Sequence, residues 1–260
     1  MTRPELALRL EALYETYNRR EFIHPDPLEF VYRYAGNRDR EVAGLVAAGL
    51  AFGRVAHILA NVGAALAPLG QNPAAFLCGA APASLEPLYR GFRHRWTSSE
   101  ELVSLLYGIG RVLRDRGTLE ACFAAHTGDG PIAVRSGLSG LVAELGGPSS
   151  LLSDPAKSSA CKRLHLYLRW MVRNDDIDPG CWTSVNPAEL VVPLDTHLHR
   201  VARGLRLTRR KQADLNTAME VTRAFRRIVP NDPLRYDFTL TRFGIRPELD
   251  MGEFLAGMRR

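Results

Sequence analysis

Lys162 and Asp195 are the two residues whose types and surroundings suit covalent catalysis. Lys162 lies near the start of "SSACKRLHLYLRWMVRNDDIDPGCW", residues 158–182, a segment with helical periodicity in which Ser158 or Ser159 can cap the start. The positive end of a helix macrodipole disfavours an ammonium group. An uncharged amine is what a nucleophilic lysine requires. The other interpretation is a solvated lysine that lies along its own helix.

Asp195 belongs to "VVPLDTHLHRVARGLRL", residues 191–207, where Leu198, Val201 and Leu205 recur at helical spacing after it. This position predicts a helix N-cap, a role that aspartate fills routinely. A capping carboxylate has a fixed direction. A fixed carboxylate also suits an anion that stabilises a cationic intermediate or accepts a proton. Capping therefore does not exclude catalysis.

The same segment has the pattern Asp195, His197, His199, which offers an alternative based on metal chemistry. On a helix, residues i and i+2 diverge by roughly 200°, so three such ligands share no face unless the backbone is irregular. Histidines that pack or contact phosphate are favoured over ligands. A metal-dependent hydrolase remains the lesser alternative, and we expect no metal and no other cofactor.

The elements that must position these residues are predicted to be helices throughout. The clearest is Ser98–Gly117, which has a capping box of Ser98 and Glu101, one apolar face, and a glycine at its end. Further helices are expected at 39–53, 57–69 and 216–229, and residues 190–192 are too short to form a sheet. The predicted fold class is all-α.

A division into two packed helical lobes, forming a single catalytic unit over residues 1–260, is the expected organisation. Residues 1–126 form most of the first lobe, and 156–260 form a second lobe with a hairpin-like segment and the two candidate catalytic residues. Residues 127–155, rich in Gly, Ser and Pro, are interpreted as the connection. They lack the GxxxxGK[ST] pattern of a phosphate loop.

Charge is distributed unevenly along the chain. The formal net charge is +6, and residues 157–211 contain 11 Lys and Arg against 5 Asp and Glu, which accounts for the whole excess. This favours a polyanionic partner. The four cysteines form no CxxC pair and no apolar run approaches a membrane span, so we expect free thiols, no membrane partner and a cytoplasmic location.

The segment "VPLDTHLHRVARGLRL" resembles the "VDTHVxRVxxRL" segment of the helix–hairpin–helix (HhH-GPD) DNA glycosylase superfamily, whose aspartate is the catalytic carboxylate. Bifunctional members carry a catalytic lysine upstream, and "SACKRLHLYLRW" has Lys162 in the corresponding position, 33 residues before Asp195. This gap is similar to that of the archaeal 8-oxoguanine glycosylase branch. Most of the chain also resembles an uncharacterised bacterial family with this superfamily's fold.

The resemblance implies a two-lobed glycosylase with AP-lyase activity, in which Lys162 forms a Schiff base and Asp195 stabilises positive charge. The implied partner is double-stranded DNA with a damaged base, bound by a nucleoid-associated monomer. We expect 8-oxoguanine as the base, with hypoxanthine, uracil and alkylated purines left open. The chain departs from the superfamily pattern because "LLSDPAKSSACK" replaces the "LPGVG" hairpin, and the iron–sulfur cysteine motif is absent.

A basic helix face and several aromatic residues are further candidates for contact with DNA. The candidates for phosphate contact are Arg169, Arg173, His197, Arg200, Arg203, Arg209, Arg210 and Lys211, with Arg54 as a weaker one. The candidates for the base pocket or for stacking are Phe52, Trp170, Trp182 and Phe243. The competing interpretations are plain surface charge and core packing. A non-catalytic DNA-binding relative is the main alternative function, and it predicts that Lys162→Gln leaves DNA binding unchanged.

Overall fold

The computed structural model describes residues 2–128, 133–157, 159–246 and 249–257. The α-helices are α1 (Arg3–Tyr17), α2 (Asn37–Gly49), α3 (Val55–Leu66), α4 (Pro73–Gly79), α5 (Pro82–Leu85), α6 (Ser99–Arg116), α7 (Leu119–His126), α8 (Ala133–Glu144), α9 (Lys162–Val172), α10 (Thr196–Gly204), α11 (Leu215–Arg226), α12 (Asp237–Ile245) and α13 (Met251–Gly257). Short 3-10 helices are η1 (Arg20–Phe22), η2 (Pro27–Arg33), η3 (Ala67–Leu69), η4 (Glu86–Tyr89) and η5 (Pro187–Glu189). The prediction of an all-α fold is confirmed.

Within the described residues, the two strands β1 (Arg93–His94) and β2 (Thr97–Ser98) form one antiparallel hairpin, in which His94 pairs with Thr97. Arg95 and Trp96 form its two-residue turn, and Arg95 has a positive φ of 56°. Strands of two residues are too short for an alternating pattern to reveal, so the sequence did not predict this hairpin.

Helix α6 matches its prediction closely. The Ser98 side chain accepts from the Glu101 N–H, the Glu101 carboxylate accepts from the Ser98 N–H, and Gly117 ends the helix with φ 83°. The predicted apolar face is buried along its whole length. Both ends and the packing face therefore follow from local sequence.

Other helix boundaries differ from their predictions. Helix α2 starts at Asn37 and ends at Gly49, so that residues 50–53, expected to be helical, form a loop instead. Helix α3 starts at Val55, and the 3-10 helix η3 continues it to Leu69. Helix α11 starts after the N-cap Asp214 and ends at Arg226. The loop between α2 and α3 carries Phe52, one of the candidate pocket residues.

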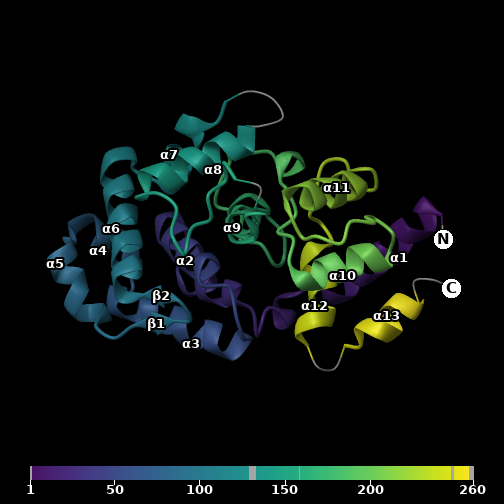
Figure 1. Ribbon diagram of the computed structural model, residues 1–260, viewed down its shortest axis with the longest axis horizontal. Coiled ribbons are helices and arrows are strands. Elements are labelled where there is room, and N and C mark those ends of the chain that lie inside the picture. The colour runs from purple at the N-terminus through teal and green to yellow at the C-terminus, as the bar shows by residue number, and fades with distance from the viewer. Residues whose placement is uncertain (1, 129–132, 158, 247–248, 258–260) are drawn as a thin grey trace.

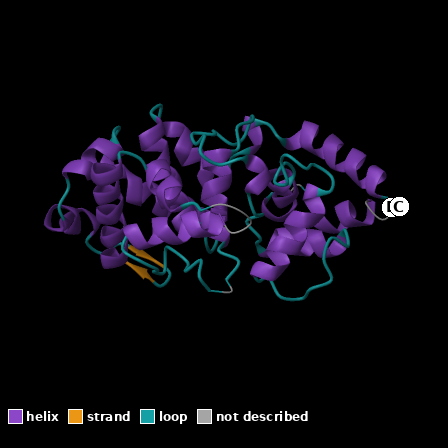
Figure 2. Cartoon of the chain, turned by 90° about the horizontal axis from the view of Figure 1, so that it is seen from above, coloured by secondary structure: helices purple, strands orange, loops and turns teal. Residues whose placement is uncertain are grey.

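Figure 1 shows α2 to α7 on one side of the central helix α9, and α10 to α13 on the other side. The N-terminal helix α1 lies with α12 and α13. In α1, Glu11 accepts hydrogen bonds from Arg235 and Tyr236, and Arg9 donates to the Gly257 carbonyl. Both chain ends therefore lie at the same end of the molecule (Figure 2).

The Gly-, Ser- and Pro-rich connection between the lobes contains the helix α8. Helix α8 packs against α7 at short range, because a Cβ at Gly140 would meet the His126 ring at 2.0 Å. The chain then runs from Leu145 to Cys161 before α9 begins, so this connection is longer than a tight hairpin. Residues 129–132 and the candidate cap Ser158 lie outside the described residues.

Helix α9 forms the centre of the core. Tyr167, Leu168, Trp170 and Met171 are fully buried, and α2 approaches so closely that a Cβ at Gly44 would lie 2.8 Å from Met171. A helix buried on most sides cannot present a long charged stripe to solvent. Among the described residues, no helix is long and apolar enough to span a membrane.

Candidate active site

The structure brings the two candidate catalytic side chains together. Lys162 is the first residue of α9, after Cys161 in the left-handed conformation (φ 44°), and Asp195 is the N-cap of α10. The Nζ of Lys162 lies 3.8 Å from Oδ2 of Asp195, and the two side chains are 35% and 16% exposed. Oδ1 of Asp195 accepts from the Leu198 N–H at 2.7 Å. One carboxylate oxygen therefore caps the helix, while the other faces the amine.

This pair lies at a cavity of about 630 Å³ that residues from both sides of α9 line. On α9 the lining residues are Lys162, Arg163, Leu166 and Arg169, and the first, third and fourth are spaced as i, i+4 and i+7 on one helix face. Lys162 is partly exposed, whereas the Arg169 side chain is only 2% exposed. The cavity therefore runs along α9 from an open rim at Lys162 to a buried floor at Arg169.

Phe52 lines the opposite wall, as predicted for a pocket residue. The Nη1 of Arg163 donates to the Gly49 and Ser150 carbonyls, and its guanidinium lies 4.8 Å from the centre of the Phe52 ring. On its other side, the Phe52 ring stacks on Trp96 of the hairpin turn, with centroids 5.0 Å apart. These contacts fix the ring in one position.

His197 also lines the cavity, next to α12. Helices α10 and α12 approach closely there, because a Cβ at Gly244 would lie 2.1 Å from Nδ1 of His197. The absence of a side chain at Gly244 lets the imidazole pack against α12. Its candidate role in phosphate contact stays a prediction.

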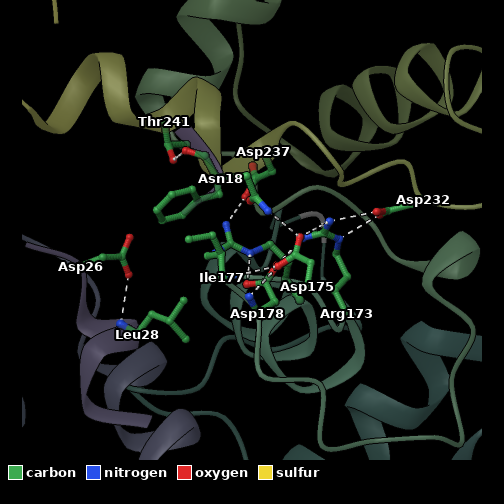
Figure 3. Close-up of polar contacts among 12 residues, drawn as sticks. Asn18, Asp26, Leu28, Arg173, Asp175, Ile177, Asp178, Asp232, Asp237 and Thr241 are labelled. Atoms are coloured by element: carbon green, nitrogen blue, oxygen red, sulfur yellow. Dashed lines mark hydrogen bonds and ion pairs between the residues drawn. The ribbon is translucent and has the colours of Figure 1, made fainter. Parts of the chain in front are cut away.

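The cavity floor is a buried network of arginines and aspartates (Figure 3). Arg169 donates from Nε to Asp178 at 3.1 Å and from Nη1 to Asp237. Arg242 of α12 donates to Asp26 at 2.6 Å. Arg169, Arg242, Asp26 and Asp237 all line the cavity. Each charge has an opposite partner, as burial requires.

Arg173 continues this network beneath the floor. It donates to Asp178, to Asp175 at 2.9 Å and to Asp232 at 2.9 Å, and its side chain is 3% exposed. Asp175 in turn accepts from the backbone N–H groups of Ile177 and Asp178, which fixes the loop after α9. The prediction that Arg169 and Arg173 contact DNA phosphates is wrong, because both guanidinium groups are buried and their charge is neutralised internally.

Three aromatic predictions are also wrong. Trp170 is fully buried in the core and does not line the cavity. Trp182 is 3% exposed and donates from Nε1 to Glu41 at 2.7 Å, packed edge-on against Tyr167. Phe243 is half-buried, stacks on Phe254 with ring centroids 4.3 Å apart, and does not line the cavity. All three act in packing.

The remaining basic candidates lie at or near the surface. Arg54, Arg200, Arg203, Arg209 and Lys211 are exposed. Arg210 is half-buried and pairs with Asp214 at 2.8 Å, and its carbonyl lies 3.0 Å from Nε2 of His199. For the exposed residues, phosphate contact remains a prediction, while the Arg210 side chain is held by Asp214 and Thr217.

The metal-based alternative finds no support in the geometry. Asp195, His197 and His199 do not bring three ligand atoms within 4.8 Å of one another, and His199 is buried against the Arg210 carbonyl. The group in the described chain that meets this distance is Cys122, His126 and Glu144, on α7 and α8.

That second group is arranged as an ion pair. Both oxygens of Glu144 accept from Arg116, and Oε1 lies 2.6 Å from Nε2 of His126. Burial raises the pKa of the Cys122 thiol to about 12, while hydrogen bonds from Arg116 and His126 lower the pKa of Glu144 to about 2. A neutral thiol beside a carboxylate that is already paired is a poor ligand set for a cation.

Several residues of the site were missed from sequence. Asp237, Arg242 and Asp26 come from segments far from α9, and nothing local indicates that they meet Arg169. Trp96 has a signal, since it is a tryptophan among polar residues in "FRHRWTSSEE" and is 59% exposed. A large aromatic side chain at a polar turn is a candidate for contact with a partner.

The fold and the site together define a predominantly helical protein with a lysine and a carboxylate at the rim of a cavity. A comparison with family models matches residues 26–246 to "Protein of unknown function (DUF2400)". Because the match covers most of the chain, the protein belongs to this family. No curated protein and no solved structure matches the chain.

Proposed function

We propose that this protein is a DNA glycosylase with AP-lyase activity that excises a damaged base through a Schiff base on Lys162. The observation that carries the proposal is the distance of 3.8 Å between Nζ of Lys162 and Oδ2 of Asp195 at the rim of a cavity of about 630 Å³. These residues are the two that the resemblance to the helix–hairpin–helix glycosylases marks as catalytic, and they are 33 positions apart in the sequence.

The chemistry needs an uncharged amine and a nearby anion. Oδ2 of Asp195 is the acceptor for the proton that Nζ loses. Nζ then attacks C1′ of the deoxyribose, the bond from C1′ to the base breaks, and the base leaves with the bonding electrons and takes up a proton. Opening of the C1′–O4′ bond gives the Schiff base. Loss of a 2′ proton and of the 3′ phosphate then cleaves the strand.

A base must leave the duplex stack to reach such a cavity, because C1′ is inaccessible within a helix. The hairpin turn next to Phe52 supports this step, since Trp96 is 59% exposed and stacks on Phe52, which lines the cavity. Arg95 lies over the Trp96 ring at 4.7 Å. An exposed aromatic ring beside a cation suits the gap that an extruded nucleotide leaves.

The second candidate function is DNA binding without catalysis. The exposed basic residues Arg200, Arg203, Arg209 and Lys211 favour it as much as they favour the enzyme. The partly buried pair of Lys162 and Asp195 favours the enzyme, since a binding protein has no need of an amine and a carboxylate at a cavity rim.

Borohydride trapping tests the proposal. The protein is incubated with duplexes that contain 8-oxoguanine, hypoxanthine, uracil or an abasic site, and the covalent adduct is measured on a denaturing gel. We expect an adduct with the wild-type protein that Lys162→Gln abolishes. Lys157→Gln is the matched control, because Lys157 pairs only with Asp154 away from the cavity. An adduct that survives Lys162→Gln, or no adduct on any duplex, contradicts the proposal.

A further inference from the structure

Three side chains that line the cavity floor each hold one buried polar atom without a partner in the described structure. These atoms are Nη2 of Arg169, Oδ1 of Asp237 and Nε of Arg242. The three side chains are 2%, 2% and 1% exposed. A buried polar atom without a hydrogen bond destabilises the folded protein, so three such atoms on side chains that line one cavity need an explanation.

The other atoms of the same side chains are fixed by strong contacts. Arg169 is held by Asp178 and Asp237, and Arg242 is held by Asp26 at 2.6 Å. Both guanidinium groups lie over the Phe238 ring, with Cζ at 5.9 Å and 4.1 Å from its centre. The three unpartnered atoms therefore belong to side chains that are held rigidly where they line the cavity, as a preorganised site requires.

Charge decides which kind of ligand this surface suits. Arg169 and Arg242 are balanced by Asp237 and Asp26, and the further carboxylate of Asp178 is shared with Arg173. The floor thus has no excess positive charge to hold a phosphate or another anion. It offers two N–H donors and one carboxylate acceptor, which suits a neutral polar group.

We propose that this floor binds the lactam edge of a nucleobase, in which a carbonyl oxygen lies beside an N–H. The carbonyl has two lone pairs and accepts from Arg169 and Arg242, while the N–H donates to Asp237. Guanine, 8-oxoguanine, hypoxanthine and uracil have this edge. Adenine and cytosine present an amino group beside a ring nitrogen that has one lone pair. The single lone pair cannot accept fully from both Arg169 and Arg242, so these two bases fit the floor poorly.

The position of the floor fits a base whose sugar is at the rim. Lys162 and Arg169 are seven residues apart on α9, which is about 10 Å along the helix axis. That length accommodates a base ring between the amine and the floor. This inference rests on the proposed function, and it narrows the substrates to bases with a lactam N–H.

Single-turnover excision by the wild-type protein tests the inference. The duplexes contain hypoxanthine, N1-methylhypoxanthine, 8-oxoguanine, 1,N6-ethenoadenine or an abasic site. We expect excision of hypoxanthine or 8-oxoguanine, and a loss of roughly 100-fold or more where the lactam N–H is methylated or absent. Equal rates for hypoxanthine and its N1-methyl form, or a preference for ethenoadenine, overturn the inference.

The abasic duplex separates the two proposals, because its cleavage needs Lys162 but no base. Cleavage of this duplex without any preference for lactam bases refutes the inference and leaves the proposed function standing. Absence of both cleavage and borohydride adducts refutes the proposed function itself.

Asp237→Asn provides a second test, since it replaces an acceptor with an amide of the same size. We expect it to lower excision of hypoxanthine or 8-oxoguanine roughly 100-fold. Asp232→Asn is the matched control, because Asp232 also pairs with a buried arginine but does not line the cavity. If Asp237→Asn does not fold, the N1-methyl comparison on the wild type decides.

Discussion

Asp195 performs two tasks with its two oxygens, and the tasks are separable by substitution. Oδ1 caps α10 through the Leu198 N–H, and Oδ2 faces Lys162. Asparagine caps a helix as well as aspartate does, but it cannot accept a proton or stabilise a cation as a carboxylate can. We therefore predict that Asp195→Asn changes the free energy of unfolding little and lowers excision about 100- to 1,000-fold, measured by urea titration and single-turnover cleavage.

Asp195→Ala is the companion variant, because it removes the cap as well. We expect Asp195→Ala to lower excision as much as Asp195→Asn does, and also to lower the free energy of unfolding by ~1 kcal/mol. Full activity in Asp195→Asn would show that the carboxylate contributes only to the helix start.

At the scale of elements, the sequence predicted the helix starts that are determined by capping side chains close by in the chain. The capping box at Ser98 and the N-cap at Asp195 specify the starts of α6 and α10, and both starts lie where predicted. The end of α2 was misplaced because "GLAFGR" contains no strong stop before Gly53. The loop it forms is held from outside, by the contacts of Arg163 and Trp96 with Phe52.

The sequence did not reveal which side chains from distant elements form ion pairs with each other. Arg169 and Arg173 were expected to be exposed for phosphate contact, but both side chains are buried. Acids from the loop after α9 and from residues 232–237 neutralise the two arginines. The convergence of Lys162 and Asp195 was expected only through resemblance to a family. Without the resemblance, Asp195 was explained as a helix N-cap and Lys162 as a solvated surface lysine.

The hairpin makes an element-scale prediction about DNA. Trp96→Ala removes the exposed ring that stacks on Phe52, so we expect affinity for a lesion duplex to fall by about 10-fold or more in a fluorescence anisotropy titration. Leu8→Ala is the matched control, because Leu8 is 73% exposed on α1 and does not line the cavity. Equal affinities for the two variants would remove the hairpin from the binding surface.

At the scale of the whole molecule, a single buried carboxylate ties three segments together. Glu41 on α2 is 2% exposed, and it accepts from the backbone N–H groups of Leu119 and Glu120 at the start of α7 and from Nε1 of Trp182. No cation pairs with it among these contacts. Burial raises the pKa of Glu41 from 4.5 to about 7, although these hydrogen bonds act in the opposite direction.

This pKa shift makes the stability of the fold depend on pH. Between pH 4.5 and about 7 the unfolded chain has lost the Glu41 proton while the folded chain retains it, so unfolding releases a proton and becomes easier as pH rises. The contribution of Glu41 is complete below pH 4.5 and is lost as pH rises through about 7, with a total on the order of 3 kcal/mol.

Glu41→Gln isolates that contribution, because every other titrating group is common to both proteins. The free energy of unfolding, measured by urea titration at pH 4.5, 6 and 8, should fall in the wild type relative to Glu41→Gln by about 3 kcal/mol over this range. A constant difference across the range would mean that Glu41 is ionised in the folded protein. In that case the hydrogen bonds from Leu119, Glu120 and Trp182 would stabilise the ionised carboxylate by more than burial destabilises it.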